Sequence, residues 1–195
     1  MNVYEAIIMI LETKGQATIP AIWEEINKLP CKVLDRDDFM DVSHLKSFIW
    51  LKREWFRVNG DLVSIRPERE PVKLIFKQSG HPGPEVKISV DFKRNTFIFH
   101  EWYYGQQSHA DRLPHNQPGS VSEFKKWLYS FQIWDWENDY QTEGIIVDGL
   151  SWSVLLETKG AVYLSEGLNS FPKGWRKFKR SISQLTGVDL RENRL

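Results

Sequence analysis

Cysteine is almost absent from this chain, which limits both how the protein is stabilised and where it works. The 195 residues include one cysteine, Cys31. A single thiol cannot close an internal disulfide, and disulfide-stabilised domains belong to oxidising compartments. A chain of this length can bury roughly 70% of its extended surface, so it needs no disulfide framework. We therefore expect a protein that folds around a hydrophobic core in the reducing cytoplasm.

Long hydrophobic runs are also missing. The longest is Ala6–Leu11, whereas a helix that spans a bilayer needs ~20 apolar residues. Glu5 and Glu12 flank this run, which is unlike the basic and then apolar order of a signal peptide. The sequence therefore predicts no membrane segment and no signal peptide.

Neither sign of charge predominates. The chain has 26 Lys and Arg residues against 26 Asp and Glu residues. This balance excludes a strongly basic nucleic-acid coat protein and an acidic disordered tail. The sequence also lacks a glycine-rich phosphate loop and a recognisable pair of catalytic carboxylates. We expect no cofactor and no catalytic residue.

Hydrophobic and aromatic residues are plentiful. They make up 41% and 13% of the chain, with nine Trp residues, as is typical of a folded globular protein. The hinge Glu68–Pro71, with Pro67 just before it, predicts a boundary between a domain of residues 1–70 and a domain of residues 71–195.

The first domain is predicted to contain three helices and a hairpin. Helices are expected over residues 2–14, 18–29 and about 41–53, with Thr18 and Asp41 or Ser43 as N-caps. Asn59-Gly60 lies between two apolar runs and is a strong signal for a hairpin turn, because both residue types tolerate positive φ. This order predicts a winged helix-turn-helix.

The same residues resemble a known family. Residues 3–65 resemble the winged-helix domain of the RNA polymerase delta subunit and the HARE-HTH proteins. The matching segments are Tyr4-Glu5-Ala6 with Ile10-Leu11, the Lys14-Gly15 helix end, Ile22 to Ile26, Leu45, and Phe56-Arg57-Val58. The resemblance covers a third of the chain and implies a role in transcription or chromatin through DNA or polymerase contacts.

Beyond residue 70 the hydrophobic period changes to two, which indicates strands. Strands are predicted over 72–76, 86–92 and 96–102, a helix over 120–131, strands over 144–147, 151–157 and 161–164, and a helix over 172–185. Three strands, a helix, three strands and a helix describe an antiparallel α+β domain. The whole chain is thus expected to be α+β, with the long loop 103–119 between its sheet and its first helix.

The third helix of the first domain holds the first candidate site. Lys46, Trp50 and Arg53 are spaced i, i+4 and i+7 and share one helix face. On a recognition helix they would contact phosphates or base edges, and Arg57 near the wing would reach the adjacent backbone. The alternative is a solvated face with Trp50 buried against the second domain.

The segment 173–180 holds the densest basic cluster. Arg176, Lys179 and Arg180 are spaced i, i+3 and i+4 and are predicted to form one patch that binds nucleic acid or another anionic partner. The alternative is an amphipathic surface helix whose basic face is simply solvated.

Aromatic residues near the long loop suggest a docking surface. Trp102, Tyr103 and Tyr104 at the base of the loop are expected to join Trp134 and Trp136 in binding a protein partner. The alternative is a core edge beside a surface loop.

The histidines give little support to an enzyme or a metal site. His100, His109 and His115 are separated by nine and six residues, a spacing that fits no standard zinc motif. Ser108, His109 and Asp111 are too close together in the sequence to form a nucleophile, base and orienting group. We predict no metal.

The sequence thus favours a non-enzymatic regulator. Its winged helix binds DNA or the transcription machinery, and its α+β domain binds a protein partner or forms a homodimer. The alternative is a protein-interaction or inhibitor module, for example in phage–host conflict, that uses the aromatic surface and binds no DNA. An enzyme with a site in the histidine-rich loop is the third interpretation.

Overall fold

The computed structural model describes residues 3–29, 41–80, 83–103, 116–142 and 149–190. The chain divides into two compact units, residues 1–70 and 71–195. The division falls at the hinge that the sequence suggests as a domain boundary. Each unit is described by itself.

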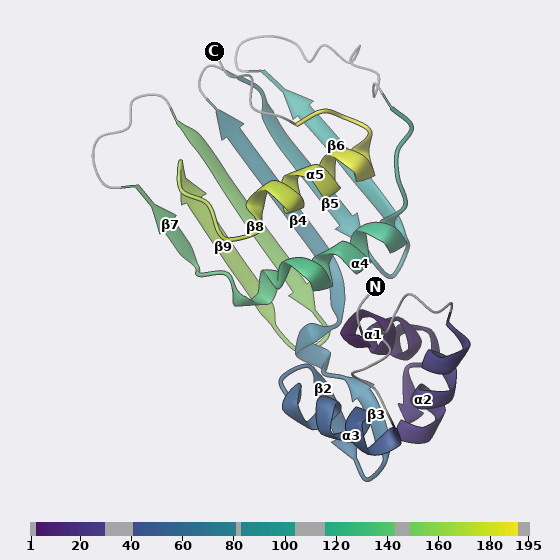
Figure 1. The fold of residues 1–195 in the computed structure, drawn as a ribbon. Coiled ribbons are helices and arrows are strands. Elements are labelled where there is room, and N and C mark those ends of the chain that lie inside the picture. Colours follow the sequence, from purple (N-terminus) through teal and green to yellow (C-terminus); the bar gives the residue numbers. More distant parts are fainter. Residues whose placement is uncertain (1–2, 30–40, 81–82, 104–115, 143–148, 191–195) are drawn as a thin grey trace. The chain divides into compact units, whose positions relative to one another are not determined.

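The first unit contains three helices and a small antiparallel sheet (Figure 1). Its elements are α1 (Val3–Lys14), β1 (Gln16–Thr18), α2 (Ile19–Lys28), α3 (Val42–Leu51), β2 (Phe56–Asn59), β3 (Leu62–Ile65) and the short 3-10 helix η1 (Pro67–Arg69). The strand order is β1-β3-β2. The sequence did not predict β1, because three residues are too few to show a period of two.

Short-range interactions determine where two of the helices begin and where the hairpin turns, at the positions that the sequence predicted. The Thr18 side chain accepts a hydrogen bond from the amide of Ala21, and Asp41 accepts from the amides of Ser43 and His44. Both residues therefore cap helices that begin directly after them. Gly60 has a φ of 61° in the turn between β2 and β3, a conformation in which glycine has no Cβ penalty.

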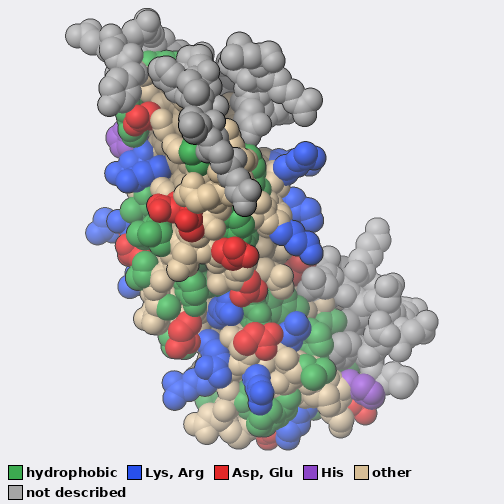
Figure 2. Space-filling view, turned by 90° about the vertical axis from the view of Figure 1, so that its left-hand side faces the viewer, with side chains coloured by type: hydrophobic (Ala, Val, Ile, Leu, Met, Phe, Trp, Pro, Cys, Tyr) green, Lys and Arg blue, Asp and Glu red, His purple; other side chains and the backbone are tan. Residues whose placement is uncertain are grey.

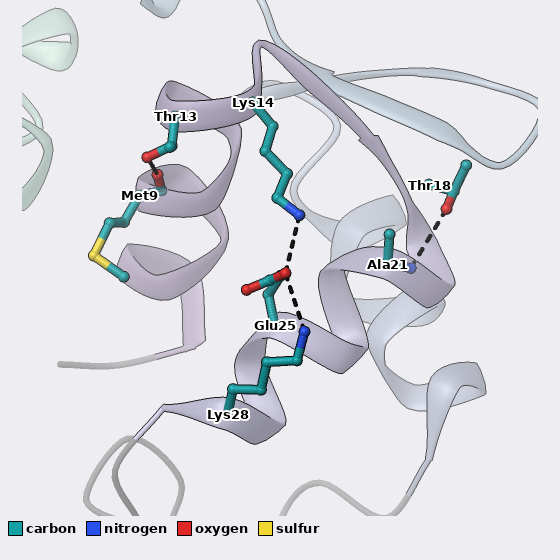
Figure 3. A network of polar contacts seen from close by, with 7 residues as sticks. All are labelled: Met9, Thr13, Lys14, Thr18, Ala21, Glu25 and Lys28. Atoms are coloured by element: carbon teal, nitrogen blue, oxygen red, sulfur yellow. Dashed lines mark hydrogen bonds and ion pairs between the residues drawn. The ribbon is translucent and has the colours of Figure 1, made fainter.

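One carboxylate links α1 to α2 (Figure 3). The Oε1 atom of Glu25 lies 3.0 Å from Nζ of Lys14 and 3.3 Å from Nζ of Lys28. Hydrogen bonds from Lys14 and then Lys28 hold the pKa of Glu25 below its ordinary value. The carboxylate thus favours the folded state when it is charged.

Replacing Glu25 by glutamine is expected to cause a small loss of stability that depends on pH. Because the folded-state pKa is lowered, the stabilisation is complete above the ordinary Glu pKa of about 4.3 and is lost as the pH falls through the lowered value. Urea unfolding of the parent and of Glu25→Gln at pH 7 and pH 3 measures this difference. Glu24→Gln, which changes an exposed carboxylate on the same helix, is the control. An equal difference at both pH values would contradict this account.

The second unit is a six-stranded sheet with two helices on one of its faces (Figure 1). Its elements are β4 (Pro71–Gly80), β5 (Glu85–Asp91), β6 (Thr96–Trp102), α4 (Val121–Phe131), the 3-10 helix η2 (Ile133–Asp135), β7 (Asp139–Gln141), β8 (Leu150–Thr158), β9 (Val162–Leu168) and α5 (Trp175–Thr186). The predicted α+β class is confirmed.

The sheet differs from the prediction at one edge. The strand order is β6-β5-β4-β8-β9-β7, and β7 runs parallel to β9, so the sheet is mixed rather than purely antiparallel. β7 was not predicted, again because it has only three residues. The predicted strand over 144–147 lies outside the described residues.

The core of this unit lies between the sheet and the helices and is rich in aromatic rings. The ring centroid of Phe178 in α5 lies 5.5 Å from that of Phe76 in β4 and 5.4 Å from that of Trp136. The ring centroid of Trp152 in β8 lies 4.5 Å from that of Trp175. Three of the nine Trp residues therefore pack here, where large apolar rings fill the space between two layers.

Candidate nucleic-acid interface

The fold of the first unit fixes which face of α3 is exposed. Leu45 and Ile49 are fully buried and hold the helix against the core. Asp41 caps the helix, and hydrogen bonding to His44 and Ser43 lowers the pKa of this carboxyl. The side chains that point away from Leu45 and Ile49 therefore face solvent.

This exposed face forms a shallow hollow of about 820 Å³. Its lining consists of Ser43, Lys46, Ser47, Trp50, Leu51 and Arg53. The structure thus brings together three predicted residues, Lys46, Trp50 and Arg53. Trp50 is 55% exposed.

The hollow is chemically suited to an anionic ligand that carries flat rings. Its lining has two cations, two hydroxyls and one exposed indole, and it contains no carboxylate. Lys46 Nζ lies 3.7 Å from Asp61 Oδ1 in the β2–β3 turn, but both side chains are more than half exposed. An exposed pair of this kind is weak, so the ammonium group can exchange Asp61 for a phosphate.

Arg53 and Arg57 differ in their surroundings. Arg53 follows the C-terminus of α3, and its backbone carbonyl accepts a hydrogen bond from Nε of Arg66 at 2.7 Å. Arg57 is exposed on β2, opposite Ser64, and does not line the hollow. Arg57 therefore places a positive charge on the surface of β2, outside the lining of the hollow.

Sequence reasoning missed Ser43, Ser47 and Leu51 in this hollow. Ser43, Lys46, Ser47 and Trp50 are spaced i, i+3, i+4 and i+7, so helical periodicity alone would have found both serines. Leu51 lies i+4 from Ser47 and i+8 from Ser43, so the same period includes it.

The predicted basic patch on α5 is only partly correct. Arg176 and Arg180 are exposed, as is Lys177, which was not predicted. Lys179 is half-buried, and its Nζ donates a hydrogen bond to Oε1 of Gln78 in β4. Lys179 is therefore not part of the exposed patch.

The helix layer as a whole carries an excess of positive charge. α5 contains no acidic residue, and α4 adds Lys125 and Lys126 against Glu123. Figure 2 views the sheet from its β7 edge and shows Lys and Arg side chains along the right side of this unit, where the helices lie. This surface is a second basic region on the chain.

The predicted aromatic docking surface is wrong. Trp134 is only 5% exposed, and Trp136 packs on Phe178 in the core. Trp102 and Tyr103 lie at the end of β6, at one edge of the sheet, whereas Trp136 precedes β7 at the opposite edge. Tyr104 lies outside the described residues. The sequence could not show this separation because it does not give the strand order.

The described residues give no support to a metal site. Among them, no group of three or more His, Cys, Asp and Glu side chains could hold a metal ion. His109, His115 and Asp111 lie outside the described residues, as does Cys31. Within the described ranges, no helix has both the length and the apolar character needed to cross a bilayer.

Comparisons with known proteins return no match: no family model fits the chain, and no curated protein and no solved structure matches it.

Proposed function

We propose that this protein is a non-enzymatic, cytoplasmic regulator whose first unit is a winged helix-turn-helix that binds duplex DNA. In this proposal Lys46 and Arg53 contact phosphates or base edges, Trp50 packs on the sugar or base, and Arg57 contacts the adjacent backbone. The second unit mediates dimerisation.

The observation that carries the proposal is the exposed face of α3. Two cations, an indole and two hydroxyls converge there without a carboxylate. The element order α1-β1-α2-α3-β2-β3 supports a winged helix, as does the resemblance of residues 3–65 to the HARE-HTH domain. The third helix of such a domain is the one that enters the major groove.

The net charge of the first unit does not oppose this proposal. Residues 1–70 contain 10 basic and 12 acidic side chains. Glu25 is engaged by two lysines, and Asp41 caps α3. Neither of these carboxylates lines the hollow, whose charged side chains are Lys46 and Arg53, while Asp61 lies 3.7 Å from Nζ of Lys46.

Separation of the aromatic residues weakens the alternative of an inhibitor module. That interpretation needs Trp102 and Trp134 on one exposed surface, and the fold places them apart. The described residues thus favour α3 over the aromatic residues as the binding surface.

The double variant Lys46→Ala/Arg53→Ala is expected to lower the affinity for duplex DNA by about tenfold or more at 100 mM salt, because each phosphate contact contributes through counterion release. Fluorescence anisotropy with a mixed pool of labelled duplexes measures this change. Lys14→Ala/Lys28→Ala, which removes the same charge from α1 and α2, is the matched control.

Two outcomes would contradict the assignment to α3. One is equal loss of affinity in the control. The other is loss only in Arg176→Ala/Arg180→Ala, which would place the nucleic-acid site on α5. If the parent binds no DNA at all, a protein partner on the same face becomes the alternative.

A further inference from the structure

The outer face of α4 and α5 carries cations without matching carboxylates. The two helices together have six basic side chains and one acidic side chain, Glu123. Lys126, Arg176, Lys177 and Arg180 are exposed. Within the described part of the chain, none of these four forms an ion pair. Their charges are therefore available to an anionic ligand.

The placement of these cations is unfavourable for the helix itself. A helix favours acidic residues in its first turn, whereas the first turn of α5 contains Arg176 and Lys177 and no acidic residue. Arg176 and Arg180 are spaced i, i+4, and like charges at this spacing destabilise a helix. A bound anion would offset both effects.

Carboxylates limit the basic surface at its margins. Glu123 lies in the first turn of α4, at the end remote from the first turn of α5. Asp135, Glu137 and Asp139 follow α4 in η2 and at the start of β7, which is an edge strand of the sheet. The positive charge is thus concentrated on the two helices, between these carboxylates.

An exposed indole accompanies the cations. Trp127 in α4 is 49% exposed, and its ring is nearly parallel to that of Phe131, with an interplanar angle of 11° and ring centroids 6.3 Å apart. The two residues are spaced i, i+4 and project from the same side of the helix. Stacking on Phe131 thus orients the indole while about half of its surface stays in solvent.

The indole projects from the side of α4 that faces α5. Phe131 contacts Phe178 of α5, with ring centroids 6.1 Å apart. The amide of Gly119, just before α4, donates hydrogen bonds to carbonyl oxygens in the last turn of α5. The helices are therefore antiparallel neighbours, as Figure 1 shows. Trp127 comes one turn before Phe131, so it lies level with the turn of α5 that follows Phe178 and carries Arg180.

We propose that this surface, named here the helix-layer face and formed by Lys126, Trp127, Arg176, Lys177 and Arg180, binds single-stranded nucleic acid. The cations contact phosphates, and Trp127 stacks on a base. Basic side chains beside an exposed aromatic ring are the combination that binds single strands without strong sequence preference. The site is separate from α3 and does not depend on the binding of duplex DNA proposed there.

Two features favour a single strand over other anionic partners. Bases in a duplex are paired and stacked on one another, so a base can stack on Trp127 only when it is free of the duplex. Trp127 is also the one large apolar side chain exposed on the described residues of α4 and α5. A protein interface has an apolar centre built from several side chains, which this face lacks.

Fluorescence anisotropy of the whole chain with labelled oligothymidylate and oligouridylate tests the site. Strands of about 12 nucleotides match the size of such sites, and the two probes distinguish DNA from RNA. Trp127→Ala is expected to lower the affinity about tenfold, because one stacked base is lost. Trp127→Phe keeps an aromatic ring and is expected to retain most of the affinity.

The charge contribution is measured in the same assay. Arg176→Ala/Arg180→Ala is expected to make the slope of log K against log salt less steep by about 1.4, since two phosphate contacts are lost. Lys77→Ala/Lys87→Ala is the matched control. These lysines lie opposite one another on β4 and β5 and alternate with buried residues of those strands, so they are on the face of the sheet away from the helices. Circular dichroism verifies that each variant is folded.

Three results would overturn the proposal. They are absence of binding to both strands at 50 mM salt, an affinity that Trp127→Ala leaves unchanged, and equal affinity for a labelled polyglutamate peptide, which has charge but no bases. Lys46→Ala/Arg53→Ala is expected to leave single-strand binding unchanged while it weakens binding to duplex DNA. Failure of the helix-layer face and failure of the α3 site are thereby distinguished.

Discussion

Replacing Phe178 by alanine is expected to lower the free energy of unfolding of the second unit by about 4 kcal/mol, as for other buried phenylalanines. Phe178 is fully buried in α5. Its ring centroid lies 5.5 Å from that of Phe76, 6.1 Å from that of Phe131, 5.4 Å from that of Trp136 and 5.7 Å from that of Trp175. The variant would leave a cavity between sheet and helices that no neighbouring ring can fill without leaving its own contacts.

Chemical unfolding followed by Trp fluorescence measures this loss. Phe171→Ala is the matched control, because Phe171 also stacks on Trp175, at 5.2 Å, but is 36% exposed. We expect Phe171→Ala to lower the free energy of unfolding by less than half as much as Phe178→Ala does. Equal losses in the two variants would show that Phe178 does not occupy the centre of the core.

Replacing Gly167 by alanine is expected to destabilise the same unit by about 3 kcal/mol, the upper range for overpacking. A Cβ at this position would lie 2.8 Å from Ser170 O, Trp152 Nε1 and Tyr140 O. Trp152 Nε1 donates a hydrogen bond to Ser170 O at 2.8 Å. The methyl group would force apart this bond and the pairing of β9 with β7 and β8.

Thermal unfolding followed by circular dichroism compares Gly167→Ala with Gly80→Ala. Among the described residues, a Cβ at Gly80 would meet the flexible side chain of Leu150, at 3.4 Å, so we expect a change of less than about 1 kcal/mol there. If both variants unfold at the same temperature as the parent, the close packing of β9 described here is wrong.

Most elements could be predicted because short-range chemistry determines them. Thr18 and Asp41, both named as N-cap candidates from the sequence, accept hydrogen bonds from the first turns of their helices, and Ser120 does the same for α4. The turn at Gly60 follows from its freedom to adopt positive φ. These signals depend on neighbours within four residues, so they can be read without knowing the fold.

The rest depends on pairings between distant residues. Lys179 is predicted to be exposed from its spacing to Arg176 and Arg180, but it lies at the flank of the buried stripe of α5 and reaches Gln78, about 100 positions earlier in the chain. Trp134 is likewise buried by tertiary packing. Which outward side chains of the sheet lie opposite one another could not be predicted either, since strand register decides it.

Residues of the α3 site were more accessible to prediction. Lys46, Trp50 and Arg53 share a face because helical geometry fixes their spacing, and the structure places all three in one hollow. Arg57 depends on tertiary structure instead: it lies on β2, opposite Ser64, and does not line the hollow.

The salt dependence of DNA binding by the whole chain tests the central claim most directly. Three phosphate contacts, from Lys46, Arg53 and Arg57, correspond to a slope of log K against log salt of about −2.7, which is about a 40-fold loss of affinity between 50 and 200 mM salt. Fluorescence anisotropy with labelled duplex across this range gives the slope. We expect a slope near this value for the parent. In Lys46→Ala/Arg53→Ala we expect the slope to become less steep by about 1.8. Absence of binding at 50 mM salt, or a slope that the variant leaves unchanged, would contradict recognition of DNA by α3.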